Sequence, residues 1–240
     1  MNLHTGTSGF SYKEWKGPFY PEKLPAGKML AHYSERLRAV EINNTFYRLP
    51  KAEVLEKWRN TVGPRFRFSL KASRRITHFS RLRESAYEPT EYLLDTVRTL
   101  GESLGALLFQ LPPNLKADHE LLAGFLARLP EDVPAAFEFR NDSWNTDGTN
   151  ELLRRHKVAL VRSDTDDADA DAPLVSTAPW GYVRLHRSAY SETELDSWAE
   201  RIRRTGWDRA FVFFKHEDDA AGPRLAEDFA TRFEGESGSG

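Results

Sequence analysis

The 240-residue chain contains no cysteine. This absence excludes disulfide bonds, thiol nucleophiles, iron–sulfur clusters and thiolate zinc sites. A metal ion would therefore have to bind histidine, aspartate or glutamate side chains. Because nothing in the chain needs an oxidising compartment, we expect a cytoplasmic protein.

Long hydrophobic runs are also absent. The longest apolar segment, Leu104 to Pro113, is far shorter than the ~20 residues that span a bilayer. The first ten residues show no basic stretch followed by an apolar one, as a secretory leader would. The sequence therefore predicts no membrane partner.

The chain has no excess of basic residues, since 34 lysines and arginines face 36 aspartates and glutamates. General nucleic-acid binding needs a broadly basic surface, so only a local basic cleft remains compatible with it. The 40% share of hydrophobic residues is ordinary for a globular protein. We expect a single domain over residues 1–234 and a flexible glycine- and serine-rich tail over 235–240.

Eight short β-like runs recur along the chain with helical patterns between them. Their first residues lie 23 to 39 positions apart, about the length of a strand with its crossover helix. The runs are Leu3 to Thr7, Ala39 to Asn43, Phe66 to Lys71, Gly105 to Leu111, Ala135 to Arg140, Val158 to Asp164, Gly181 to His186 and Ala210 to Lys215. This repeat predicts an α/β fold, a (β/α)8 TIM barrel.

Sequence signals predict where three of the helices begin. Asp118 and Thr90 precede apolar stripes and are predicted to be N-caps, and Ser191 with Glu194 has the form of a capping box. The sixth crossover instead contains an acidic run, Asp164 to Pro173, without an apolar stripe. We therefore expect the sixth helix to be short or missing and the barrel to be slightly irregular there.

Several strands alternate apolar and charged residues, although parallel strands covered on both faces are usually apolar throughout. If the apolar face lies under the helices, the charged face points into the barrel. Most of these polar residues fall at the carboxyl ends of strands, where barrel enzymes have their active sites. The set is Glu41, Asn43, Lys71, Gln110, Glu138, Arg140, Asp164, Arg184, His186 and either Lys215 or His216. Each residue alone could be a salt-bridge partner, but together they predict a functional mouth.

Aromatic side chains gather in the loops expected at the same end, among them Tyr12, Trp15, Tyr47 and Trp144. Their faces could stack on a base or a sugar ring, or they could pack as lids over the barrel. A divalent metal ion is compatible with the histidines and carboxylates, but no pair has a diagnostic spacing. No sequence signature indicates an organic cofactor or a serine nucleophile.

Several motifs are familiar in combination. They are Gly6-Thr-Ser-Gly-Phe-Ser-Tyr-Lys-Glu-Trp15, Val40-Glu-Ile-Asn-Asn-Thr-Phe-Tyr-Arg-Leu-Pro50, Leu108-Phe-Gln-Leu-Pro-Pro113, Glu138-Phe-Arg140 and Tyr182-Val-Arg-Leu-His186. In this order the chain resembles the YecE-like family, the domain of unknown function seventy-two. The resemblance implies a TIM barrel of unassigned activity. It also implies that the family positions at the mouth correspond to Glu41, Asn43, Tyr47, Lys71, Thr77, His78, Gln110, Glu138, Arg140, Trp144, Asp164, Arg184 and His186.

The leading hypothesis is an enzyme, a hydrolase or phosphoesterase, that acts on a small anionic substrate with a phosphate group. Glu41, Glu138 and His186 would be catalytic, and Lys71, Arg140 and Arg184 would bind the anion. The other substrate-binding candidates are Tyr12, Trp15, Asn43, Tyr47, His78, Gln110, Trp144, Asp164 and Lys215. Two alternatives use the same mouth: a protein that binds a nucleotide or single-stranded nucleic acid without turnover, and a sugar-phosphate isomerase or lyase.

Overall fold

Eight parallel strands form a closed barrel in the computed structural model, which describes residues 1–167, 169, 172–215 and 218–235. Each strand pairs with the next along the chain, and the eighth pairs with the first. The strands are β1 (Asn2–Ser8), β2 (Ala39–Ile42), β3 (Arg67–Lys71), β4 (Leu104–Gln110), β5 (Ala135–Glu138), β6 (Ala159–Asp164), β7 (Trp180–Leu185) and β8 (Arg209–Phe214). The predicted TIM barrel is confirmed.

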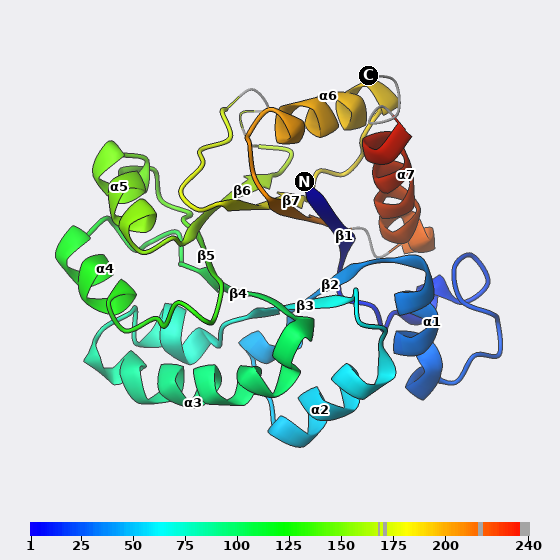
Figure 1. The fold of residues 1–240 in the computed structure, drawn as a ribbon, viewed down its shortest axis with the longest axis horizontal. Helices are drawn as coiled ribbons and strands as arrows, with labels where there is room; N and C mark the ends of the chain where they lie inside the picture. The colour runs from blue at the N-terminus through cyan, green and yellow to red at the C-terminus, as the bar shows by residue number, and fades with distance from the viewer. Residues whose placement is uncertain (168, 170–171, 216–217, 236–240) are drawn as a thin grey trace.

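The longer helices lie outside the ring of strands, as Figure 1 shows. They are α1 (Met29–Arg36), α2 (Ala52–Thr61), α3 (Tyr87–Val97), α4 (His119–Leu126), α5 (Asp147–Arg155), α6 (Glu192–Arg203) and α7 (Ala221–Gly235). Short helices in the connections are η1 (Lys13–Trp15), η2 (Ala26–Lys28), η3 (Asn44–Phe46), η4 (Arg75–Phe79), η5 (Glu84–Ala86), η6 (Arg98–Ser103), η7 (Asp142–Trp144) and η8 (Asp218–Ala220). Residues 236–240 of the predicted flexible tail lie outside the described part.

The sixth crossover, between β6 and β7, departs from the repeat as the sequence predicts. Among its described residues, 165–167, 169 and 172–179, the chain forms no helix. Figure 1 shows loops there, between α5 and α6. The acidic run lacks the apolar stripe with which a helix would pack on the strands.

Two of the three predicted helix starts are confirmed. The Asp118 side chain accepts a hydrogen bond from the Leu121 amide, and Ser191 and Glu194 form a reciprocal capping box at α6. The prediction for Thr90 is wrong, because α3 begins at Tyr87 and the Thr90 hydroxyl donates to the carbonyl of Ala86, the N-cap residue of the helix. Pro89 fits the first turn, where an amide needs no partner, so the helix extends upstream of Thr90.

Apolar side chains fill two regions. One lies between the strands and the helices, and the other fills the barrel with Ala39, Leu108, Val161, Tyr182 and Phe211, among others. Alternation along each strand then decides which neighbours also face inward. The strand ends above this apolar filling therefore present polar side chains to the mouth.

Candidate functional site

A buried ion triad lies at the carboxyl end of the barrel. Glu41 comes from β2, Glu138 from β5 and Arg184 from β7, and their side chains are 0%, 3% and 5% exposed. Arg184 donates from Nε and Nη2 to the two carboxylate oxygens of Glu41, each at 2.9 Å, and from Nη1 to Glu138 at 2.5 Å. The triad thus links three strands across the barrel.

Further donors satisfy the carboxylate of Glu41. The Ser8 and Tyr182 hydroxyls donate to it at 2.7 and 2.8 Å, and the Asn43 amide donates at 3.2 Å. Two of these donors, Ser8 and Tyr182, were not predicted. Tyr182 lies two positions before the predicted Arg184 on β7 and shares its face, so strand alternation could have identified it. Ser8 ends β1, on which no site residue was predicted.

Glu138 is satisfied in the same way. Gln110 donates to Oε1 at 2.9 Å, and the Arg140 Nε donates to the same oxygen at 3.0 Å. The structure thus brings the predicted residues Glu41, Glu138 and Arg184 together with Asn43, Gln110 and Arg140. A carboxylate with this many donors is held in one position and stays ionised.

These contacts determine the pKa values of both glutamates. Burial alone raises the pKa of Glu41, but the charge of Arg184 and the hydrogen bonds outweigh it, so that the pKa falls to about 2. The pKa of Glu138 is lowered in the same way, by Arg184 and Arg140 against the effect of burial. At neutral pH both glutamates are therefore anions and cannot act as proton donors.

Three further cations at the mouth, Lys71, Arg140 and Lys215, form fewer side-chain hydrogen bonds and ion pairs than Arg184 does. The Lys71 Nζ lies 4.4 Å from the centre of the Phe46 ring and makes no hydrogen bond or ion pair within the described part of the chain. Arg140 is 46% exposed, and Lys215 is exposed. His216, the alternative to Lys215, lies outside the described residues. Burial, with the charge of Arg184, lowers the pKa of Lys71 to about 8.

His186 is connected to the triad through Ser8. The Ser8 hydroxyl donates its hydrogen to Glu41, so the His186 Nε2 at 3.1 Å must be the donor in the contact with Ser8. In the neutral ring the other nitrogen, Nδ1, is then the proton acceptor. Burial and the charge of Arg184 lower the pKa of His186 to about 3, which keeps the ring neutral at pH 7.

An exposed aromatic rim lies beside Lys71, formed by Phe46, Tyr47, His78 and Phe79 with Arg74. The His78 and Tyr47 rings meet Phe46 edge to face at 4.9 and 5.1 Å. Tyr47 and Phe79 are each 67% exposed, and the Arg74 guanidinium lies 5.4 and 5.3 Å from their rings. Burial, followed by the charge of Lys71, lowers the pKa of His78. Phe79 and Arg74 were not predicted, because no periodic pattern marks the irregular connection after β3.

Two of the predicted stacking residues are buried instead. Trp15 is 1% exposed and packs against Tyr12, Phe19 and Tyr20. Trp144 is 2% exposed, and its Nε1 donates to the Leu115 carbonyl. Neither ring presents a face to a ligand, so both serve as packing in the loops over the barrel. Tyr12 is partly exposed, with its hydroxyl donating to the Ser8 carbonyl at 2.6 Å.

Two further predictions about the mouth need correction. Asp164 is buried on the outer side of β6, since Val161 faces inward, and it accepts a hydrogen bond from Tyr190. Arg184 was expected to bind the ligand, but all three of its nitrogens donate to glutamates. Without Asp164, the described residues of the predicted mouth comprise four cations, Lys71, Arg140, Arg184 and Lys215, and two carboxylates, an excess of two positive charges on a chain of net charge −2.

A cavity of about 1090 Å³ adjoins the mouth at Glu138 and Arg140 and extends along β6 toward Trp207. Within the described residues, no three histidine, aspartate or glutamate side chains are arranged to hold a metal ion. No described helix is long and apolar enough to cross a membrane.

Fold and site together define a (β/α)8 barrel with a polar, cationic mouth. The sequence model of the family described as a protein of unknown function, DUF72, matches residues 4–239. The chain belongs to this family.

Named relatives agree with this assignment. The chain is 30% identical over 133 residues to the UPF0759 protein YunF of Bacillus subtilis, over 52% of this chain and 47% of YunF. It is 33% identical over 124 residues to the UPF0759 protein YecE of Escherichia coli K12, over 51% of this chain and 45% of YecE. The chain thus spans about half the length of the curated relatives it matches. The crystal structure of a DUF72 family protein from Thermotoga maritima superposes with a TM-score of 0.78 at 27% identity, covering 99% of both chains.

Proposed function

We propose that the protein is an enzyme that acts on a small anionic substrate with a phosphate group, bound at the carboxyl end of the barrel. The observation that carries this proposal is the pair Lys71 and Arg140, which lie next to the triad. Their positive charges are only partly neutralised by acidic partners, whereas the charges within the triad are paired. The excess of positive charge is local, since the whole chain is net negative. Cations arranged around a low-dielectric floor attract anions and stabilise charge that develops on them.

In this proposal the anion contacts the residues with free donors. Lys71 supplies an ammonium group that has no acceptor among the described residues, and Arg140 supplies the two terminal nitrogens that do not bind Glu138. A guanidinium can bind two oxygens of one phosphate group side by side. Glu41, Glu138 and Arg184 act as positioning residues, because they hold Ser8, Gln110 and Arg140 in place.

His186 is the proton acceptor in this proposal. Its Nδ1 is unprotonated while Nε2 donates to Ser8. A bound anion would offset the positive charges of Arg184 and Lys215 that lower its pKa, and thus make it a stronger base. In phosphoester hydrolysis, water adds to phosphorus and gives a proton to His186, and the ester P–O bond breaks. The leaving alkoxide takes a proton from solvent water, and His186 returns its proton to the solvent. The same base would serve a sugar-phosphate isomerase or lyase, in which it removes a proton from carbon.

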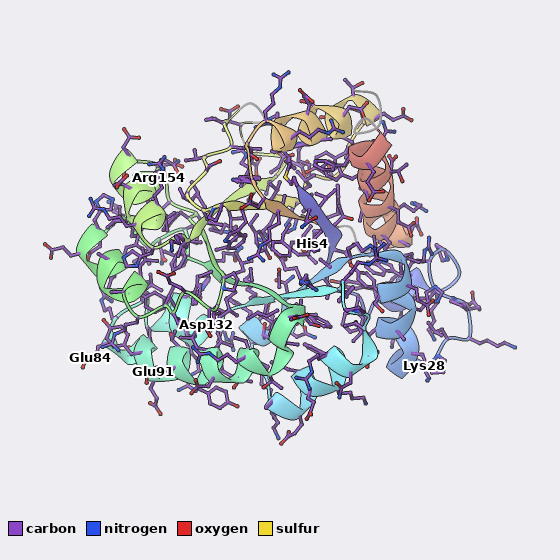
Figure 2. The ribbon with its side chains drawn as sticks, viewed as in Figure 1. His4, Lys28, Glu84, Glu91, Asp132 and Arg154 are labelled. Carbon is purple, nitrogen blue, oxygen red and sulfur yellow. The ribbon has the colours of Figure 1, made fainter. Side chains whose placement is uncertain are left out.

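A panel of phosphoesters and sugar phosphates, screened with and without added divalent metal ions, tests the proposal. We expect turnover by the wild type, a kcat lower by about 10²- to 10⁴-fold for His186→Gln, and a raised KM for Lys71→Gln. Lys28→Gln is the matched control, because Lys28 is an exposed lysine at the outer edge of the molecule (Figure 2). Absence of turnover for every compound, with and without metal, would contradict the enzymatic function.

The exposed aromatic rim supports a second candidate function, binding of a nucleotide or a single-stranded nucleic acid without turnover. Tyr47 and Phe79 offer ring faces next to Lys71, and bases stack on such rings in single-strand binding. Labelled oligonucleotides at several salt concentrations test this candidate. We expect affinity that falls steeply with salt and that Tyr47→Ala weakens. Failure to bind at low salt would exclude it.

A further inference from the structure

A second group of basic side chains lies at the opposite end of the barrel, where the strands begin. We call His4, Arg67 and Arg209 the amino-end cluster. His4 stacks on the inward-facing Phe211 at 5.0 Å, and Arg209 lies two residues before Phe211 on β8. Arg67 pairs in register with the inward-facing Ala39. Figure 2 labels His4 on β1, near the centre of the molecule. The cluster thus closes the end of the barrel away from the mouth.

No carboxylate of the described residues contacts the two arginines of the amino-end cluster. Arg67 donates from Nη1 to the carbonyls of Pro64 and Phe66, at 2.7 and 3.0 Å. The Arg209 guanidinium lies over the Trp180 and Phe211 rings, at 5.6 and 5.9 Å. Within the described part of the chain, neither arginine forms an ion pair with an aspartate or glutamate.

The two arginines are close enough to repel each other. Burial lowers the pKa of Arg209, the charge of Arg67 lowers it further, and Asp208 opposes this only from beyond ion-pair distance. Burial also lowers the pKa of His4 to about 4, with contributions from Arg67, Arg209 and Arg38. Positive charge is therefore concentrated here as well, in a half-buried position.

An unpartnered polar atom gives an independent indication of a ligand. The Nδ1 of His4 is buried and has no hydrogen-bond partner among the described residues. Buried polar atoms in folded proteins nearly always have one. Two half-buried guanidinium groups without a carboxylate lie beside a buried imidazole nitrogen without a hydrogen-bond partner among the described residues. An anion that accepts hydrogen bonds would supply the missing negative charge.

We propose that the amino-end cluster binds one small tetrahedral oxyanion of the phosphate or sulfate type. Its oxygens would accept hydrogen bonds from Arg67 and Arg209, whose planar groups match such anions. The anion would offset the repulsion between the two arginines and raise the pKa of His4, whose ring could then donate to it. This site is separate from the mouth, at the other end of the barrel.

Binding at the amino-end cluster would also stabilise the fold. His4, Arg67 and Arg209 come from β1, β3 and β8, and the pairing of β1 with β8 is the one that closes the barrel. A ligand that binds only the folded state raises the melting temperature in a saturable manner. The expected ligand effect is therefore a stability effect, which needs no knowledge of the reaction at the mouth.

Inorganic phosphate at millimolar concentration is the probe, compared with chloride at equal ionic strength. To remove the contribution of the mouth, the full chain carries Lys71→Gln throughout. We expect phosphate to raise the melting temperature saturably in this background, with apparent affinity at least tenfold weaker after Arg209→Gln. Arg67→Gln, measured in the same way, covers the case in which Arg209→Gln does not fold. Arg65→Gln is the matched control, since Arg65 is exposed and lies two residues before Arg67.

Two results of the melting experiment would overturn the amino-end site. One is the same melting temperature in phosphate and chloride in the Lys71→Gln background. The other is an unchanged phosphate response in whichever of Arg209→Gln and Arg67→Gln folds. Titration calorimetry with phosphate, on the wild type and on Lys71→Gln, separates the two sites. If Lys71→Gln by itself abolishes phosphate binding, the anion binds at the mouth and the amino-end site is contradicted.

Discussion

Arg184 binds Glu41 with two parallel hydrogen bonds of 2.9 Å, across the barrel from β7 to β2, while its third nitrogen binds Glu138. All three side chains are shielded from water. Two carboxylates therefore depend on a single guanidinium for most of their compensating charge.

Replacement of Arg184 by methionine should destabilise the protein strongly. Arg184→Met leaves Glu41 buried without its cation and Glu138 with only the half-exposed Arg140, and breaking a buried pair in this way costs about 3–5 kcal/mol. The free energy of unfolding in urea measures this loss. Glu151→Ala, at a position with 52% exposed side chain, should change it by less than about 0.5 kcal/mol. A loss below about 1 kcal/mol for Arg184→Met would mean that water enters the triad.

Stability should fall on the acid side of neutrality. The folded-state pKa of His186, about 3, lies below its usual 6.5, so the unfolded chain takes up the proton first as pH falls below 6.5. Glu41, at about 2 instead of 4.5, adds a loss of stability between pH 4.5 and 2. His186→Gln should therefore flatten the pH dependence of the unfolding free energy between pH 4 and 6.5. His4, with a pKa of about 4, keeps part of the slope, and an unaltered slope in His186→Gln would contradict the prediction.

Lys71 should lose its proton more readily than an ordinary lysine. Its pKa of about 8 compares with the usual 10.5, because burial and Arg184 disfavour the charged form. Reductive methylation with labelled formaldehyde followed by NMR titration reports this value, and Lys71→Arg assigns the signal. A midpoint near 8 that moves upward on addition of phosphate is expected. A midpoint above 10 would show that the amine is fully hydrated.

Two glycines should respond in opposite ways to alanine. A Cβ on Gly6 would lie 1.8 Å from the carbonyl oxygen of Ala39 on the neighbouring strand, so Gly6→Ala should cost about 3 kcal/mol or more, or prevent folding. Gly124 lies in α4 with open space around its Cβ position, and Gly124→Ala should stabilise the protein by up to about 1 kcal/mol. Thermal unfolding of both variants checks this, and equal melting temperatures would contradict it.

The sequence predicted the barrel because periodicity and spacing are local properties. The same alternation identified Glu41, Glu138 and Arg184 as inward-facing side chains, which the structure brings together. The alternation did not predict that Arg184 forms ion pairs with two glutamates, because this pairing depends on the strand register and on the width of the barrel. Which of two inward cations pairs and which stays available is decided in three dimensions.

The loop residues were harder to predict for a different reason. Tryptophans such as Trp15 and Trp144 are typical of stacking sites, but whether a ring in an irregular loop is buried depends on its tertiary contacts, here with Tyr20 and Leu115 respectively. Asp164 was assigned to the mouth because it ends a strand, although a shift of one residue along a strand exchanges its two faces. Loops and strand ends therefore accounted for most of the corrections.

The pairing of β5 with β6 is the weak seam of the barrel. β5 and β6 are paired only at Ala136 with Ala159 and at Phe137 with Leu160, whereas β1 and β8 are paired along six residues. Local opening starts where a structure has the fewest backbone pairs to break. Amide hydrogens of β6 should therefore exchange with solvent sooner than those of β1. Because β6 also lines the cavity next to Arg140, local opening of the barrel should occur on the side of this cavity.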